Sequence, residues 1–452
     1  MKKIFGVFLV LVLCVLALTS CGFNPESTAD VMAKIDKKMD SLKSYEAELT
    51  ASLSTKVSYL DCEAEFTGKT IVINKKGEFY YYDTMDGVMK LSGMLTDQTV
   101  NTKQINAFYD GKMFVSNETD EPAQKQKFYS VLTEDEYIAY REKQGGDLDI
   151  DFEECVNKSF TKNEDKTWTL KYSGYTKKTI DQFMEAFGDD LFEDEITDME
   201  IGIHANRDFT VRAMEIKMIF EKDSSFTVSM RYSAYNEATA ITDTLNTADY
   251  KEIADCRLLT DIEDMFEALE KEENGSFVLD IEQTVKIPAL SYEETSTEKD
   301  TVSYGKKDGK YFYDITASYP DGDIGISYEN GKQTITYDGN SQTETQTEDD
   351  AIAFINGLIN TANYKSSYVS NLEKLEEGVY KITCEAPVVS EYEAMFEALG
   401  ISCDSAKQII TVTVSDGKIT KIVNEVTATG SGKISYTNVN VTIEVNSTNT
   451  FN

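Results

Sequence analysis

The feature that most constrains the fold of this chain is an internal repeat. The two halves match in three places: Thr133–Tyr140 with Thr347–Phe354, Phe183–Gly188 with Met395–Gly400, and Gly77–Tyr81 with Gly309–Tyr313. The matches keep their order along the chain, which chance similarity would not do. We therefore predict two tandem copies of one domain, over residues 28–256 and 257–452, each of ordinary single-domain size.

Each copy has the pattern of an opening helix followed by antiparallel strands. Val31, Ile35, Met39 and Leu42 recur at helical spacing in the first copy, and Thr260–Glu263 predicts a capping box at the start of the second helix. Turn dipeptides then separate strand-like segments, at Lys76–Gly77, Asp110–Gly111, Asp308–Gly309, Asn330–Gly331, Asp338–Gly339 and Asp416–Gly417. Ile410, Val412 and Val414 alternate before the last of these turns, and Ile419 and Ile422 follow it. Short helices are expected at 182–187, 349–359 and 392–399.

The chain begins with a lipoprotein leader. Lys2 and Lys3 precede an apolar run that ends in Leu18, Thr19, Ser20 and Cys21, and this order is that of a secretory signal. The last four residues resemble the bacterial lipobox. The resemblance implies that signal peptidase recognises Leu18, Thr19 and Ser20, that Cys21 carries the lipid, and that residues 21–27 form a short tether. The apolar run is shorter than the ~20 residues that cross a bilayer. We therefore expect a protein anchored by lipid on the extracytoplasmic face of the cell membrane.

One strand in each copy carries aromatic residues on both faces. Phe79–Tyr82 and Tyr311–Tyr313 are uninterrupted aromatic runs, whereas a sheet with one wet face alternates apolar and polar residues. Something must therefore cover both faces of these strands. A curved sheet with helices or an apolar ligand on its concave face is the simplest arrangement that does so.

With the lipobox, the element order and the turn spacing, the chain resembles the LolA-like lipoprotein-carrier superfamily, which includes the mycobacterial lipoproteins of the LppX and LprG type. The resemblance implies an α+β fold of two tandem curved antiparallel half-barrels, each with an N-terminal helix and short helices over its concave face. It also implies an apolar ligand, a lipid or acyl chain, in that pocket. We assign Phe79, Tyr81, Tyr311 and Tyr313 as the candidate ligand-binding residues.

Composition excludes several classes of function. The net charge of −36 opposes binding to nucleic acid, because phosphate binders need clustered cations. The five cysteines beyond Cys21 are Cys62, Cys155, Cys256, Cys384 and Cys403, and none lies at CxxC spacing. We expect scattered buried thiols, with a Cys384–Cys403 disulfide as the alternative.

Catalytic and metal motifs are missing from the sequence. His204 is the single histidine, and no Gly-x-Ser-x-Gly elbow or Gly-rich phosphate loop occurs. Asp147–Asp151 alternates acids as a calcium loop does, but Phe152 and Lys158 stand where the loop needs glycine and glutamate. The acidic run from Asp189 to Glu200 is interpreted as a solvated segment, with weak cation binding as the alternative. Trp168, with Leu170 and Tyr172, is interpreted as core, with a sugar platform as the alternative.

The sequence therefore predicts a protein that is not an enzyme and that needs no cofactor or metal. Its predicted function is to bind or carry an apolar ligand at the membrane. The alternative is a cell-surface interaction or structural lipoprotein without a small-molecule ligand. No protein partner can be named from the residues.

Overall fold

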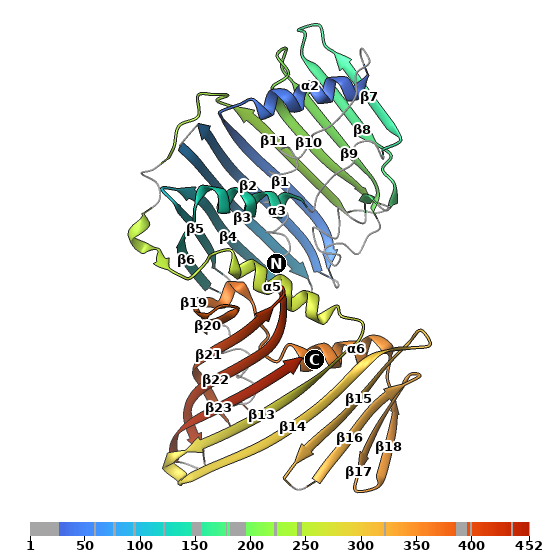
Figure 1. Ribbon diagram of the computed structural model, residues 1–452, viewed down its shortest axis with the longest axis vertical. Helices are drawn as coiled ribbons and strands as arrows, with labels where there is room; N and C mark the ends of the chain where they lie inside the picture. The colour runs from blue at the N-terminus through green and yellow to red at the C-terminus, as the bar shows by residue number, and fades with distance from the viewer. Residues whose placement is uncertain are drawn as a thin grey trace. The chain divides into compact units, whose positions relative to one another are not determined.

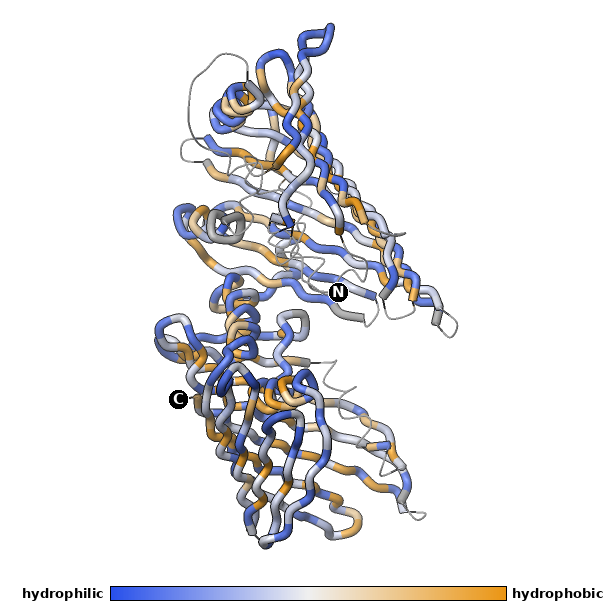
Figure 2. The backbone as a smooth tube through the Cα atoms, turned by 90° about the vertical axis from the view of Figure 1, so that its right-hand side faces the viewer, coloured by the Kyte–Doolittle hydropathy of each residue, from blue (hydrophilic) through white to orange (hydrophobic). Residues whose placement is uncertain are grey.

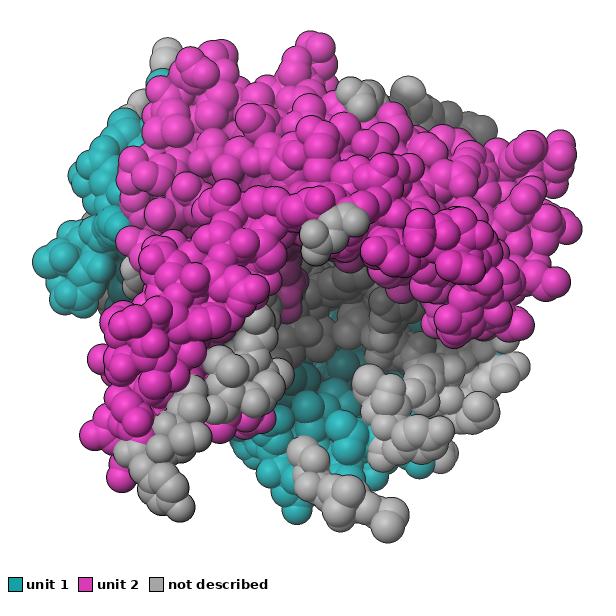
Figure 3. All heavy atoms as spheres, turned by 90° about the horizontal axis from the view of Figure 1, so that it is seen from below, with its two compact units in different colours: residues 1–252 teal, residues 253–452 magenta. Residues whose placement is uncertain are grey.

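The computed structural model describes residues 27–451 apart from 58–59, 76–77, 94–95, 121–122, 147–154, 178, 181–195, 221–223, 242–245, 321, 386–395, 398–399 and 435–436. The chain divides into a first unit that ends at Glu252 and a second unit from Ile253 to Asn452, coloured separately in Figure 3. The leader and its predicted site residues Leu18, Thr19, Ser20 and Cys21 lie outside the described residues.

The first unit is a 12-stranded sheet in the order β12-β6-β5-β4-β3-β2-β1-β11-β10-β9-β8-β7 (Figure 1). Its elements are α2 (Thr28–Asp40), β1 (Ser44–Val57), β2 (Leu60–Lys75), β3 (Glu78–Gly93), β4 (Thr96–Tyr109), β5 (Lys112–Asp120), β6 (Ala123–Val131), α3 (Glu134–Gly146), β7 (Asn157–Lys162), β8 (Trp168–Ser173), β9 (Ile196–Ala205), β10 (Val211–Phe220), β11 (Ser225–Ser233), the 3-10 turn Thr247–Asp249 and β12 (Lys251–Glu252).

The second unit is an 11-stranded sheet in the order β18-β17-β16-β15-β14-β13-β23-β22-β21-β20-β19. Its elements are α5 (Leu258–Glu270), β13 (Gly275–Ile287), the 3-10 turn Pro288–Leu290, β14 (Tyr292–Lys307), β15 (Lys310–Tyr319), β16 (Gly322–Glu329), β17 (Lys332–Tyr337), β18 (Asn340–Thr345), α6 (Glu348–Ile359), the 3-10 turn Ser366–Tyr368, β19 (Val369–Glu376), β20 (Val379–Glu385), β21 (Ile401–Ser415), β22 (Lys418–Ile434) and β23 (Thr437–Phe451).

The two units share one topology. In each, a helix precedes six strands, a second helix follows, and five further strands come next, the last of them pairing with the first strand. The first unit has one more strand, β12, at the edge beside β6. The ladders are antiparallel throughout the described residues except where β12 joins β6 in parallel. A common topology is what a duplication predicts.

The expected α+β class, with two small half-barrels covered by helices, is wrong. The chain is mainly β, with 66% strand and 16% helix, and its sheets are large and keep an edge strand on each side. Strands such as β2, β3 and β22 run for 16 to 17 residues, longer than the segments that apolar alternation alone marks. In β4, polar residues obscure this alternation. The strand nevertheless pairs with β3 along its length.

The predicted hairpin turns form. Asp110–Gly111, Asp308–Gly309, Asn330–Gly331, Asp338–Gly339 and Asp416–Gly417 all have positive φ at both residues, the conformation that the twist of a two-residue hairpin requires. Val412 pairs with Ile422 and Val414 with Ile419 across the last turn, as expected. Lys76–Gly77 lies outside the described residues.

Side-chain caps start the helices at equivalent places in the two units. At α3, the Glu136 amide donates to Thr133 Oγ1, and the Thr133 amide donates to Glu136 Oε2. At α6, the Asp350 amide donates to Thr347 Oγ1. The matching Thr-Glu-Asp segments are therefore helix N-termini.

The expected capping box of α5 is wrong. This helix begins at Leu258, with Arg257 as its N-cap, so Thr260 lies within the first turn. The expected helix at 349–359 is α6. The expected helix at 182–187 and most of that at 392–399 lie outside the described residues.

The core of the first unit lies between α2 and one face of its sheet. Val31, Ile35 and Met39 of α2 are buried against strand residues of this face, among them Leu170 and Ile203, and Leu42 packs beside them half-buried. Figure 2 shows hydrophobic and hydrophilic residues alternating along the strands. Trp168, Leu170 and Tyr172 are buried in this core, in agreement with their interpretation as core.

Candidate functional site

The predicted ligand residues of the first unit pack against α3. Tyr137 of α3 is 1% exposed. Its ring lies 5.9 Å from the rings of Phe79 and Tyr81 and stacks on Phe108 at 4.4 Å. Tyr81 pairs directly with Val72, which pairs with Tyr45 in the main core. The face that carries Phe79 and Tyr81 is thus the one that the protein's own helices cover.

The other face of β3 is covered as well. Tyr80 and Tyr82 form a second core with Ala238 and Tyr250. The Tyr80 hydroxyl accepts from the Ile241 amide at 3.0 Å and lies 3.1 Å from the Ile241 carbonyl, to which it donates. The segment after β11 therefore covers the second face, and both faces of the aromatic strand are closed by protein.

A charged side chain lies inside this aromatic cluster. Arg141 of α3 is 8% exposed, and its guanidinium lies over the Tyr81 ring at 4.2 Å. The Tyr81 hydroxyl is buried without a hydrogen-bond partner among the described residues. Burial raises the pKa of the nearby Asp83 carboxyl to about 6, although Thr70 donates to it and Arg141 favours its charge.

In the second unit, α6 covers the equivalent tyrosines. Tyr311 and Tyr313 are buried, and the Tyr313 ring lies 5.6 Å from Tyr328 and 5.7 Å from Phe354 of α6. The Tyr313 hydroxyl accepts from Gln333 Nε2 at 2.6 Å. These residues are part of the packing between helix and sheet.

The same face of the second sheet stays apolar beyond α6. Directly paired residues share a face, and Ile315 pairs with Ile326, which pairs with Ile335. We call the half-buried and exposed residues of this face the open strip; they are Ile281, Val285, Tyr319, Ile324, Ile326, Ile335 and Tyr337. Tyr319 is 38%, Ile335 39% and Tyr337 51% exposed. In Figure 1, α6 lies near one end of β15–β18, and the opposite ends carry no described helix.

An acidic pair borders the open strip on β14. Asp300 pairs with Leu279 on one side and Ala317 on the other. It is 4% exposed, and its Oδ1 has no hydrogen-bond partner in the described part of the chain. Burial, together with the neighbouring charge and hydrogen bond of Glu298, raises the pKa of Asp300 to about 7. The Tyr319 hydroxyl donates to Glu298 Oε1. The arrangement is a polar anchor at the edge of an apolar surface.

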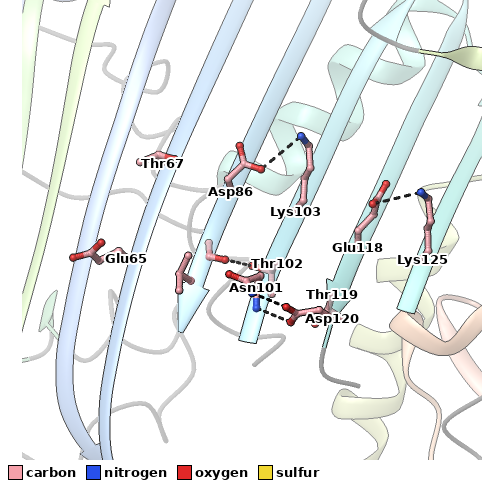
Figure 4. Close-up of a pocket in the computed structure, with 12 residues that line it drawn as sticks. Glu65, Thr67, Asp86, Asn101, Thr102, Lys103, Glu118, Thr119, Asp120 and Lys125 are labelled. Carbon is pink, nitrogen blue, oxygen red and sulfur yellow. Dashed lines mark hydrogen bonds and ion pairs between the residues drawn. The ribbon is translucent and has the colours of Figure 1, made fainter. Parts of the chain in front are cut away.

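A shallow depression of about 700 Å³ lies on the opposite, outer face of the first sheet (Figure 4). Most of its lining residues are polar, and two ion pairs cross it: Lys103 with Asp86 at 3.7 Å and Lys125 with Glu118 at 3.6 Å. Asp120 accepts from the Asn101 amide at 2.7 Å. Cross-strand pairs of polar side chains therefore stabilise this surface.

The remaining candidate residues are dispersed. His204 on β9 lies 3.2 Å from the Thr169 hydroxyl. Cys62, Cys155, Cys256, Cys384 and Cys403 form no disulfide with one another, so the alternative Cys384–Cys403 bridge is not formed. The described residues contain no group of three His, Cys, Asp or Glu side chains placed to hold a metal ion. Asp147–Asp151 and most of the run from Asp189 to Glu200 lie outside them. Among the helices that the structure describes, none has the length and apolarity to cross a membrane.

Sequence reasoning missed the open strip and its acidic pair. The signal that could have found them is the pattern of β14, where Glu298 and Asp300 occupy the same parity as the apolar Val302 and Tyr304. An acid in phase with a buried face is unusual unless it has a partner.

Comparisons with known proteins do not assign a family. No family model and no curated protein matches the chain. Among solved structures, the β domain of the Bordetella autotransporter BrkA is 5% identical, over 90% of this chain and 99% of that one, with a TM-score of 0.12. OprD from Pseudomonas aeruginosa is 7% identical, over 90% and 95%, with a TM-score of 0.15. A porin-like protein from Bacteroides uniformis is 9% identical, over 91% and 98%, with a TM-score of 0.11. Superpositions this poor support no conclusion about function.

Proposed function

We propose that this protein is a lipid-anchored extracytoplasmic binding protein that holds an apolar ligand, such as a lipid or acyl chain, against the open strip of its second unit. The anchor is Cys21, at the end of the lipobox. The proposal includes no catalytic step, cofactor or metal. The observation that carries it is the exposure of Tyr319, Ile335 and Tyr337 on a sheet face that is otherwise core.

The location of the ligand follows from what the helices cover. Phe79 and Tyr81 contact α3, and Tyr313 contacts α6, so a ligand on these aromatics must displace a helix. On the open strip it displaces no helix that the structure describes. Contiguous exposed apolar surface of this kind marks binding sites, and each 100 Å² that a ligand covers contributes about 2.5 kcal/mol before the costs of association.

The test is binding of diphenylhexatriene, an apolar probe that fluoresces when it leaves water. The protein is the mature chain, residues 21–452, with Cys21→Ala to remove the acyl chains. Ile335→Asp places a charge on the open strip and should abolish the fluorescence. Because Ile335 is already 39% exposed, the thermal melt should change little.

The matched control is Thr336→Asp, one residue along β17 and on the opposite face. This variant should keep the wild-type fluorescence. Organic extraction of the wild-type protein, followed by mass spectrometry, should recover a copurified apolar compound. If the wild-type protein neither takes up the probe nor retains such a compound, the alternative remains, a surface interaction or structural lipoprotein without a small-molecule ligand.

A further inference from the structure

The acidic pair on β14 has more acceptor capacity than its surroundings satisfy. Asp300 is buried, and its Oδ1 has no partner among the described residues. Glu298, which shares a hydrogen bond with Asp300, also accepts one from the Tyr319 hydroxyl. A buried acceptor without a donor loses its hydration free energy, and no hydrogen bond within the protein compensates for this loss. The raised pKa of Asp300 favours a proton on the pair, which limits this loss in the free protein. A ligand that donates hydrogen bonds and carries positive charge removes the loss altogether.

Neighbouring cations do not meet this demand. Lys299 follows Glu298 in sequence but lies on the opposite face, where it pairs with Asp280 at 3.2 Å. No described lysine or arginine shares the face of the open strip on β13–β17. This holds from the Tyr304–Tyr313 pair to the far ends of the strands. Tyr319 and Tyr337 add aromatic faces, which attract cations and not anions.

We infer that the open strip takes an amphipathic primary amine, whose ammonium group binds between Asp300 and Glu298 while its apolar body lies along Ile324, Ile326 and Ile335. This inference rests on the proposed function, because it names the head group of the same ligand. An ammonium group has three donors, enough for Asp300 Oδ1 and for Glu298. A carboxylate or phosphate head group would be repelled by the pair.

The first unit supplies an internal comparison. The sequence match makes Tyr81 equivalent to Tyr313. When this equivalence is extended through the strand pairing, Phe66 corresponds to Glu298 and Gly68 corresponds to Asp300. Phe66 is buried in the main core. The equivalent positions of the first unit thus carry no acid, and amine binding belongs to the second unit.

The experiment compares three probes of one chain length, decylammonium, decanol and decanoate, as competitors of diphenylhexatriene on residues 21–452 with Cys21→Ala. For the wild-type protein we expect decylammonium to compete at least tenfold better than decanol, and decanoate to compete worst. Asp300→Asn keeps the side-chain shape but removes the charge. It should bring decylammonium to the level of decanol and leave decanol unchanged.

Asp280→Asn is the control, because it removes an acid from the opposite face of the neighbouring strand; it should leave the tenfold preference intact. Equal competition by the amine and the alcohol in the wild-type protein would overturn the inference and leave the proposed function standing. An amine preference that persists in Asp300→Asn would also overturn it. If no probe competes and the protein binds no diphenylhexatriene, the proposed function itself fails.

Discussion

Tyr137→Ala tests whether the aromatic face of the first unit is a packed core. Tyr137 is 1% exposed and contacts the rings of Phe79, Tyr81 and Phe108. Truncating a fully buried aromatic residue costs about 3–5 kcal/mol. Alanine recovers roughly 0.5 kcal/mol of helix propensity. We therefore expect the free energy of unfolding to fall by about 2.5–4.5 kcal/mol.

The assay is specific to the first unit because Trp168 is the only tryptophan of the chain and is buried in that unit's core. Its fluorescence in urea reports the unfolding of this unit without contribution from the second. At about 2–4 °C per kcal/mol for a unit of this size, the melting temperature should fall by roughly 5–18 °C.

Two controls bracket the result. Tyr137→Phe keeps the ring and should retain most of the stability. Val131→Ala changes a residue that is 65% exposed, and it should stay within about 0.5 kcal/mol of the wild type. A loss below about 1 kcal/mol for Tyr137→Ala would refute the packing argument. The helix would then be easily displaced, and Phe79 and Tyr81 would again be available to a ligand.

Three further predictions follow from the same physical arguments. Arg141→Met should lower the free energy of unfolding of the first unit by about 2 kcal/mol or more, because it removes a buried cation that lies over the Tyr81 ring and favours the ionised form of nearby Asp83; an unchanged or raised stability in the Trp168 urea assay would contradict this. Cys21→Ala in the full chain should stop acylation and leader processing, and the wild-type protein should partition into detergent phase in Triton X-114 extraction while the variant carries no acyl mass. The pKa of Asp300 is raised on folding, from 3.8 to about 7, so its ionisation opposes folding above that range, and stability should increase as the pH falls from 8 towards 4; calorimetry of the second unit's transition should show this gain in the wild type and a smaller one in Asp300→Asn.

Local chemistry made part of the fold predictable. Two-residue turns such as Asp416–Gly417 require positive φ at both positions, and few residue pairs tolerate that conformation. Thr133 and Thr347 mark helix starts because a side-chain oxygen must satisfy the first free amides. These signals depend on a few consecutive residues, so the sequence displays them directly.

The size of the sheets and the place of the site depend on residues far apart in sequence. α5 begins at Leu258 although Thr260 carries the better capping pattern, because burial of Leu259 and Ile262 sets where the helix lies. The open strip exists because α6 covers Tyr313 but leaves Ile335 exposed, and no pattern within β17 encodes where a helix after β18 will lie.

The two units show how one topology can be closed in one copy and open in the other. In the first unit, Phe66 pairs with Gly87, and a side-chain Cβ built on Gly87 would lie 2.6 Å from the Phe66 ring. In the second unit, the equivalent neighbours are Glu298 and Tyr319, joined by a hydrogen bond. The large aromatic residue is therefore on the adjacent strand, as Tyr319, and an acid, Glu298, takes the place of the apolar Phe66 ring that fills the core of the first unit. Because the strand pairing is the same in both, the difference lies in the side chains alone. A duplicated domain can thus keep one copy as a scaffold while the other exposes a polar anchor within an apolar face.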